Sequence, residues 1–265
     1  MSLKDKSFFM FDIDGVLVSG LVEWDVQILG GYRSFTTLRK AGKRFVLLGS
    51  GSSWSTREAW SMFRSLGFMI DCEQVWLATK VAAKHLLKQL GKTKCLVVGE
   101  EGLARELESH GHSVVKDWKK ADAVVVGHDR FISFEKLTNA LRAINNNDAY
   151  FVAVNKVRWY YSPISGPFLS PGAIVNSLEF QTGKKAVVAG KPSQLHFTTV
   201  LEVFNVKPEQ AVMVGDSPES DLKPARELGI TTVLVKSVDR WEKNVDNGFG
   251  KDVVVSKVDD LIFYL

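Results

Sequence analysis

The segment from residue 8 to residue 17 places the strongest constraint on how this 265-residue chain can fold. Its apolar run Phe-Phe-Met-Phe is typical of a buried strand, and it ends at Asp12-Ile13-Asp14-Gly15. Burying an unpaired carboxylate is costly, so two of them at a strand end require a cation or a ligand. The glycine permits a turn whose amides can face an anion. A plain turn that ends a strand is the alternative, and the rest of the chain argues against it.

Short apolar runs recur along the chain, with amphipathic helices between many of them. Strands are predicted at residues 8–13, 44–48, 95–98, 123–126, 150–154, 186–189, 211–214 and 232–235. A capping box at residues 55–58 precedes apolar positions spaced i, i+3, i+4 and i+7, and Gly67 ends that helix. Strands that alternate with helices predict an α/β fold with a mainly parallel sheet.

Four strand ends carry polar groups suited to chemistry. They are Asp12 and Asp14 in the first motif, Gly49-Ser50-Gly51 after the second strand, Lys191 within Gly-Lys-Pro-Ser, and Asp216 and Asp221 within Val-Gly-Asp-Ser-Pro-Glu-Ser-Asp. Two of these ends precede residue 55 and two follow residue 185, and the region between has its own strand–helix alternation. We therefore expect a catalytic core from residues 1–77 and 183–265, with an inserted α/β domain at 78–182.

Phosphoryl transfer through a covalent intermediate explains all four strand ends together. Asp12 is the expected nucleophile, and Asp14, two residues on, is the expected general acid and then base. Asp216 with Asp12 can hold Mg²⁺, and Lys191 can bind the phosphate. Taken singly, the lysine could be a surface cation and the later aspartates could be turn and cap residues.

Composition argues against several other classes of partner. The net charge is only +4 and the lysines are scattered, which does not indicate a nucleic-acid-binding surface. No apolar run approaches the roughly 18 residues that a membrane span needs. We expect a cytoplasmic protein with a small anionic substrate, and neither nucleic acid nor membrane as a partner.

These motifs resemble those of the haloacid dehalogenase (HAD) superfamily, in particular the 4-nitrophenylphosphatase and phosphoglycolate/pyridoxal phosphatase group, whose inserted domain is a class II subtype A cap. Phe-Asp-Ile-Asp-Gly-Val-Leu is similar to the first motif, and the lysine and acidic motifs match as well. The resemblance implies a Rossmann-like core and an aspartyl-phosphate intermediate. It also implies Mg²⁺ bound by Asp12, Asp216 and the main-chain carbonyl of Asp14, with Asp221 as a ligand or an orienting group. Dimers through the cap are common in the group, so a homodimer is a further expectation.

The chain departs from the family pattern in two places. Gly49-Ser50-Gly51 stands where a Thr or Ser followed by two asparagines is usual, so we expect Ser50 and the glycine amides to bind phosphate instead. In the cap, Asn155-Lys156-Val157 replaces Asn-Pro-Asp. Substrate choice is expected there, at Asn155, Lys156 and Arg158, and at Asp129.

The sequence thus predicts a Mg²⁺-dependent phosphomonoesterase that acts on a small phosphorylated metabolite, with 4-nitrophenyl phosphate as an artificial substrate. The alternative is a catalytically weakened relative that binds a phosphorylated ligand as a sensor or partner, which the altered second motif favours. A dehalogenase or mutase is disfavoured, because Asp14 is what a hydrolytic phosphatase requires.

Overall fold

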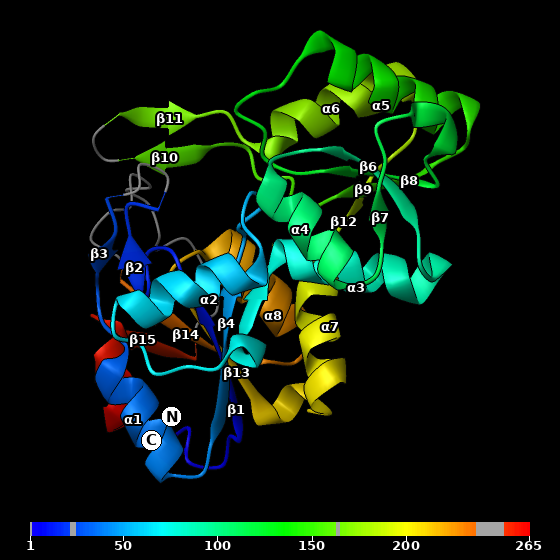
Figure 1. The fold of residues 1–265 in the computed structure, drawn as a ribbon. Helices are drawn as coiled ribbons and strands as arrows, with labels where there is room; N and C mark the ends of the chain where they lie inside the picture. Colours follow the sequence, from blue (N-terminus) through cyan, green and yellow to red (C-terminus); the bar gives the residue numbers. More distant parts are fainter. Residues whose placement is uncertain (1, 22–24, 163–164, 237–251) are drawn as a thin grey trace.

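A computed structural model describes residues 2–21, 25–162, 165–236 and 252–265, and most of its strands belong to two separate parallel sheets (Figure 1). The larger sheet, here called the core sheet, has the strand order β15-β14-β13-β1-β4-β5, and every neighbouring pair in it is parallel. Its strands are β1 (Phe8–Asp12), β4 (Arg44–Gly49), β5 (Val75–Leu77), β13 (Ala211–Gly215), β14 (Thr231–Val235) and β15 (Val253–Val255).

Helices cover both faces of the core sheet, which explains why β1 is continuously apolar from Phe8 to Phe11 rather than alternating. Phe9 and Phe11 pack in a cluster with α1, α2 and η5, while Phe8 and Met10 face α3, α7 and α8. These helices are α1 (Tyr32–Lys40), α2 (Thr56–Ser65), α3 (Ala78–Leu90), α7 (Gln194–Phe204) and α8 (Lys223–Glu227), with the 3₁₀ helix η5 (Val258–Phe263).

The second sheet, here called the cap sheet, has the order β12-β9-β8-β6-β7 and is also parallel. Its strands are β6 (Lys94–Val98), β7 (Ser113–Val114), β8 (Ala123–Val126), β9 (Tyr150–Ala153) and β12 (Val187–Val188), and its helices are α4 (Glu101–Ser109), α5 (Phe134–Asn146) and α6 (Pro171–Thr182). Two hairpins complete the described fold, β2 (Val18–Ser19) with β3 (Gln27–Ile28) and β10 (Tyr160–Ser162) with β11 (Gly166–Phe168).

The α/β class with mainly parallel sheets is confirmed, and each predicted strand is present to within a residue or so at its ends. The predicted division at 182/183 differs from the sheet pairing. It assigns β12 to the core, whereas β12 pairs with β9 in the cap sheet. An apolar strand pattern does not reveal which sheet a strand joins. The predicted boundary assigns β12 to the core because Lys191, which belongs to the catalytic motifs, follows β12 closely in the sequence. We propose that the cap extends over residues 78–189. Within the described residues, no helix combines the length and apolarity that crossing a bilayer requires.

One hydrophobic cluster runs continuously from the core sheet into the cap. It includes Phe8 in β1, Val81 in α3, Leu103 in α4 and Val125 in β8, all fully buried. A cap that shares its apolar core with the catalytic domain cannot swing away without exposing that surface to water. The fold therefore favours a cap held in one position over the site.

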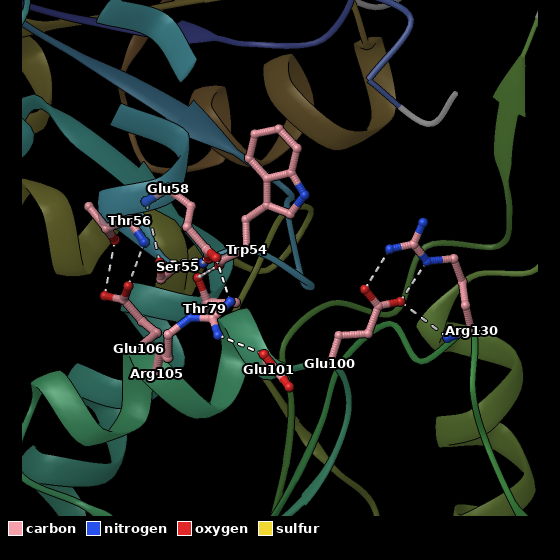
Figure 2. Close-up of polar contacts among 10 residues, drawn as sticks. All are labelled: Trp54, Ser55, Thr56, Glu58, Thr79, Glu100, Glu101, Arg105, Glu106 and Arg130. Atoms are coloured by element: carbon pink, nitrogen blue, oxygen red, sulfur yellow. Dashed lines mark hydrogen bonds and ion pairs between the residues drawn. The ribbon is translucent and has the colours of Figure 1, made fainter. Parts of the chain in front are cut away.

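Glu106 of α4 adds a polar contact between cap and core (Figure 2). Its two carboxylate oxygens accept the Thr56 amide hydrogen at 2.5 Å and the Thr56 hydroxyl at 3.0 Å, and the side chain is buried. Thr56 is the first residue of α2, where backbone N–H groups lack partners within the helix and the helix dipole favours negative charge. A cap residue thus completes the start of a core helix.

Glu106→Gln should lower the free energy of unfolding by about 1–3 kcal/mol, because the amide that replaces one carboxylate oxygen cannot accept a hydrogen bond from Thr56. Urea unfolding measures this change. Glu101→Gln is the matched control, since the Glu101 side chain is 88% exposed and pairs with Arg105 on the surface. Equal stability of the two variants would contradict the role of Glu106.

Candidate active site

Asp12 ends β1 at the carboxyl edge of the core sheet, between β4 and β13. Its side chain is buried, and its Oδ1 accepts the amide hydrogen of Ile13 at 2.7 Å. Asp14 lies two residues on, exposed toward a large cavity that Asp12 also lines. The two carboxylates of the first motif therefore open onto the same space.

Gly15 brings the first motif close to Asp216, which follows β13. Its φ is +83°, and a Cβ placed there would lie 2.3 Å from Asp216 Oδ2. A side chain at residue 15 would therefore collide with a carboxylate of the site. The expected anion-binding nest does not form at Gly15 itself, because its amide donates to the Val18 carbonyl at 2.8 Å.

Lys191 joins the carboxylates of two core strand ends. Its ammonium group lies 2.5 Å from Asp12 Oδ1 and 2.7 Å from Asp221 Oδ1, and the residue is 1% exposed. Asp221 is itself fixed, because its Oδ2 accepts the amide hydrogen of Ser217 at 3.0 Å. Asp221 thus holds Lys191 beside Asp12, and this contact is compatible with either role, ligand or orienting group, that the resemblance implies for Asp221.

Opposing effects act on the pKa values of Asp12 and Lys191. Burial raises the pKa of Asp12, the Asp221 and Asp216 carboxylates raise it further, and Lys191 opposes them. Burial alone would lower the pKa of Lys191, but attraction to Asp12 and Asp221 outweighs it and raises that pKa. Asp12 and Asp221 thus share the ammonium group of Lys191, and Asp216 adds a third buried carboxylate close to them.

This donor set fits a hard divalent cation. Ligand oxygens of Asp12, Asp216 and Asp221 lie within 4.8 Å of one another, and all three side chains are buried. Oxygen-only donors with excess negative charge are what Mg²⁺ binds. The residues present are thus chemically suited to the metal that the sequence predicts.

A cavity of about 1240 Å³ lies between the core strand ends and the cap. Its floor includes Asp12, Asp14 and Asp216, and its roof includes Arg158 and Trp159 of the loop after β9. The volume suits a small molecule rather than a folded protein.

The second strand end, Gly49-Ser50-Gly51, also lines the cavity. Gly49 ends β4, and a Cβ there would lie 2.8 Å from both Ile13 Cδ1 and Leu77 Cδ2, so a threonine would have to displace these side chains. Ser50 lines the cavity, but its carbonyl accepts a hydrogen bond from Asn155 Nδ2 of the cap at 2.7 Å. The hydroxyl of Ser52, the alternative phosphate donor to Ser50 in this strand end, lies 3.1 Å from that of Tyr160.

The cap residues expected to select the substrate already have partners inside the protein. Lys156 pairs with Glu179 at 2.8 Å, and Asp129 pairs with Lys136 at 2.7 Å. The Arg158 guanidinium lies 4.5 Å from the centre of the Trp159 ring. The first contact fixes the loop after β9 and the second fixes the loop after β8, and both Lys156 and Asp129 line the cavity. Arg158 on Trp159 is the better candidate for contact with substrate.

Glu179 stabilises the cap through two lysines, and its effect should depend on pH. Burial would raise its pKa, but hydrogen bonds from Lys156, Lys185 and the Ala186 amide lower it to about 2, from an ordinary value of 4.5. A carboxyl with a depressed pKa in the folded state stabilises the protein above its unfolded-state pKa and loses that effect as pH falls to the folded-state value. The Glu179 contribution is therefore complete above about pH 5 and lost toward about pH 2.

We expect Glu179→Gln to be less stable than the parent by about 1–2 kcal/mol at pH 7, and by progressively less below pH 5. Urea unfolding at several pH values measures the difference. Glu202→Gln serves as the control, because Glu202 pairs with Lys88 in an exposed position. A difference that stays constant from pH 7 to pH 3 would show that Glu179 acts through packing alone.

Comparison with known proteins assigns the family. A family model described as haloacid dehalogenase-like hydrolase matches residues 9–113, and a second, described as HAD-hydrolase-like, matches residues 188–261. Chronophin from Mus musculus is 32% identical over 236 residues, covering 85% of this chain and 79% of its own. Dihydroxyacetone phosphatase from Corynebacterium glutamicum is 30% identical, covering 86% of this chain and 80% of its own. The structure of p-nitrophenyl phosphatase from Archaeoglobus fulgidus matches with a TM-score of 0.89 at 29% identity, covering 98% of this chain and 100% of that one.

The chain therefore belongs to the haloacid dehalogenase-like hydrolases. Within them it falls in the group that contains the 4-nitrophenylphosphatases and chronophin, as the sequence motifs predicted, and it is a phosphatase.

Proposed function

We propose that this protein is a Mg²⁺-dependent phosphomonoesterase that hydrolyses a small phosphorylated metabolite through an aspartyl-phosphate intermediate. The observation that supports this most directly is the position of Lys191, which is buried between Asp12 and Asp221. Asp12 and Asp14 both line the cavity. A binding protein would need the cation, but it would have no use for a nucleophile and a proton-transfer group side by side.

In the proposed first step, Asp12 attacks the phosphorus atom and the bond to the leaving oxygen breaks. Asp12 Oδ1 already accepts hydrogen bonds from Ile13 and Lys191, so we assign the attack to Oδ2. Asp14 gives its proton to the leaving oxygen. In the second step, Asp14 takes a proton from water as the water oxygen attacks phosphorus, which releases phosphate and restores Asp12.

Lys191 supports both steps by lying against the nucleophile and offsetting the negative charge that gathers on phosphate. Asp221 keeps the ammonium group in place. Asp12, Asp216 and the Asp14 main-chain carbonyl would hold Mg²⁺. When bound, the ion would neutralise the carboxylates and allow an anionic substrate to approach.

The cavity and the cap support the proposed substrate class. A space of about 1240 Å³ under a cap that shares the core's hydrophobic cluster suits a small metabolite better than a folded protein. Arg158 stacked on Trp159 suits a substrate with an anionic or ring-bearing group.

A panel of phosphorylated metabolites tests the proposal, with 4-nitrophenyl phosphate included, Mg²⁺ present and released phosphate as the measured product. We expect hydrolysis of the artificial ester and faster hydrolysis of at least one metabolite, both above the level of the Asp12→Asn variant. Tight binding of a phosphorylated compound with no release above that level would support the sensor alternative instead. The homodimer through the cap and the cytoplasmic location stay predictions.

A further inference from the structure

The turn that follows β4 is enclosed by residues of the cap. We call residues 50–54 the serine turn. Asn155 of the cap donates a hydrogen bond to the Ser50 carbonyl, and Thr79 of α3 donates to the Trp54 carbonyl at 3.0 Å. Both ends of the serine turn are therefore held by side chains from the inserted region.

Two cap glycines lie against the middle of the same turn. A Cβ on Gly127, after β8, would lie 2.5 Å from the Ser52 carbonyl oxygen. A Cβ on Gly102, in the first turn of α4, would lie 2.1 Å from the Ser53 carbonyl oxygen. Contact this close to a backbone oxygen admits no side chain at either position, so cap and turn fit as one packed unit.

A directed chain of hydrogen bonds crosses from the cap to the serine turn. Asn155, fully buried, donates through Nδ2 to the Tyr160 hydroxyl oxygen at 3.0 Å as well as to Ser50. An amide nitrogen only donates, so Tyr160 accepts from Asn155 and can pass its own hydrogen to Ser52 Oγ at 3.1 Å. The Ser52 hydroxyl hydrogen is then available to the cavity that Ser52 lines. Burial raises the pKa of Tyr160, which keeps its hydroxyl protonated and able to donate.

We infer that Asn155 and Tyr160 are positioning residues: they orient the serine turn, and the Ser52 hydroxyl in particular, toward the phosphate group. This inference rests on the proposed phosphatase function. The serine turn lacks the side chains usual in the second motif, since Gly49 offers no hydroxyl and no asparagine follows it in Gly49-Ser50-Gly51. In this chain, the cap therefore completes the phosphate site of the core and does more than select the leaving group.

Tyr160→Phe is the sharpest test, because it removes one hydroxyl and keeps the ring packed against His128. We expect kcat/KM for 4-nitrophenyl phosphate to fall about 3- to 10-fold, the scale of one lost hydrogen bond, and inhibition by inorganic phosphate to weaken by a similar factor. Tyr150→Phe is the matched control. It removes a hydroxyl bonded to His85 elsewhere in the cap, and both constants should stay at the parent values.

A double-mutant cycle separates positioning from direct contact. If Tyr160 acts through Ser52, adding Tyr160→Phe to Ser52→Ala should cause no further loss. If the two substitutions lower kcat/KM independently, so that their factors multiply in the double variant, the inference is overturned and Tyr160 is a substrate contact. So would parent-like inhibition by inorganic phosphate in Tyr160→Phe, because inorganic phosphate has no leaving group to touch the cap. Asn155→Ala should behave like Tyr160→Phe or worse, but it leaves a buried carbonyl unpaired, so the folding of that variant is checked by circular dichroism.

Failure of the proposed function has a different signature. A parent protein with no hydrolysis of any ester would contradict the phosphatase assignment. Calorimetry would then still measure the affinity of the parent and of Tyr160→Phe for inorganic phosphate in the presence of Mg²⁺. Equal affinities would overturn the positioning role.

Discussion

Replacing Asp12 with asparagine should abolish both turnover and the phosphoenzyme, a loss of more than about 10⁴-fold, because an amide is a far poorer nucleophile. Asp14→Asn should still form a phosphoenzyme but turn over about 10²- to 10⁴-fold more slowly, the usual effect of losing a general acid and base. Rapid quenching with radiolabelled substrate measures the phosphoenzyme, and released phosphate measures turnover.

Asp252→Asn is the control for the first prediction. Asp252 accepts hydrogen bonds from Thr232 near the start of β14, at the opposite edge of the core sheet from the site. Its replacement should reduce stability and leave turnover unchanged. Near-normal turnover in Asp12→Asn would exclude the covalent mechanism, whatever the behaviour of Asp14→Asn.

Removal of divalent metal should also eliminate activity, and added Mg²⁺ should restore it. Asp12, Asp216 and Asp221 place ligand oxygens of three buried carboxylates within 4.8 Å of one another, so a bound cation relieves the repulsion among them in the folded state. A ligand that binds only the folded protein raises its stability, by about 2.7 kcal/mol at a concentration 100 times the Kd. Mg²⁺ should therefore raise the Tm, and chelator should lower it.

Asp216→Asn provides the matched variant for the metal prediction. We expect the Mg²⁺ concentration for half-maximal activity to rise by at least about 10- to 100-fold, and the Tm of the variant to respond little to Mg²⁺. Exposed Asp71 lies far along the chain from the acidic motif, and Asp71→Asn should respond to Mg²⁺ like the parent. Activity that persists in excess chelator would exclude the metal role.

Most of the fold could be predicted because strand and helix patterns are local. The capping box of Ser55 and Glu58 and the buried run of β1 are visible in the sequence, and both occur as expected. The short strands β5 and β15 were missed, because three apolar residues carry no periodicity. The pairing of β12 with the cap sheet was also missed, because pairing depends on residues far away in the chain.

The candidate site could be predicted where a motif fixes the chemistry, and not where contacts cross between domains. Asp12, Lys191 and Asp216 lie together as their motifs indicated. The partners of Lys156 and Asp129 could not be foreseen, since Glu179 and Lys136 become neighbours only after the cap has folded. The same holds for Tyr160, whose only sequence signal was its place in an aromatic run.

The central position of β1 in the core sheet has a consequence for synthesis on the ribosome. β1 pairs with β4 on one side and with β13 on the other, and β13 begins only at Ala211. At about 5–20 residues per second, the edge of β1 that faces β13 waits about 10–40 s for its partner. All strands of the cap sheet lie between Lys94 and Val188, so the cap can form during that interval. The nascent chain can therefore carry a folded cap sheet beside the open edge of a largely apolar strand, which is the state in which we expect it to need a chaperone most.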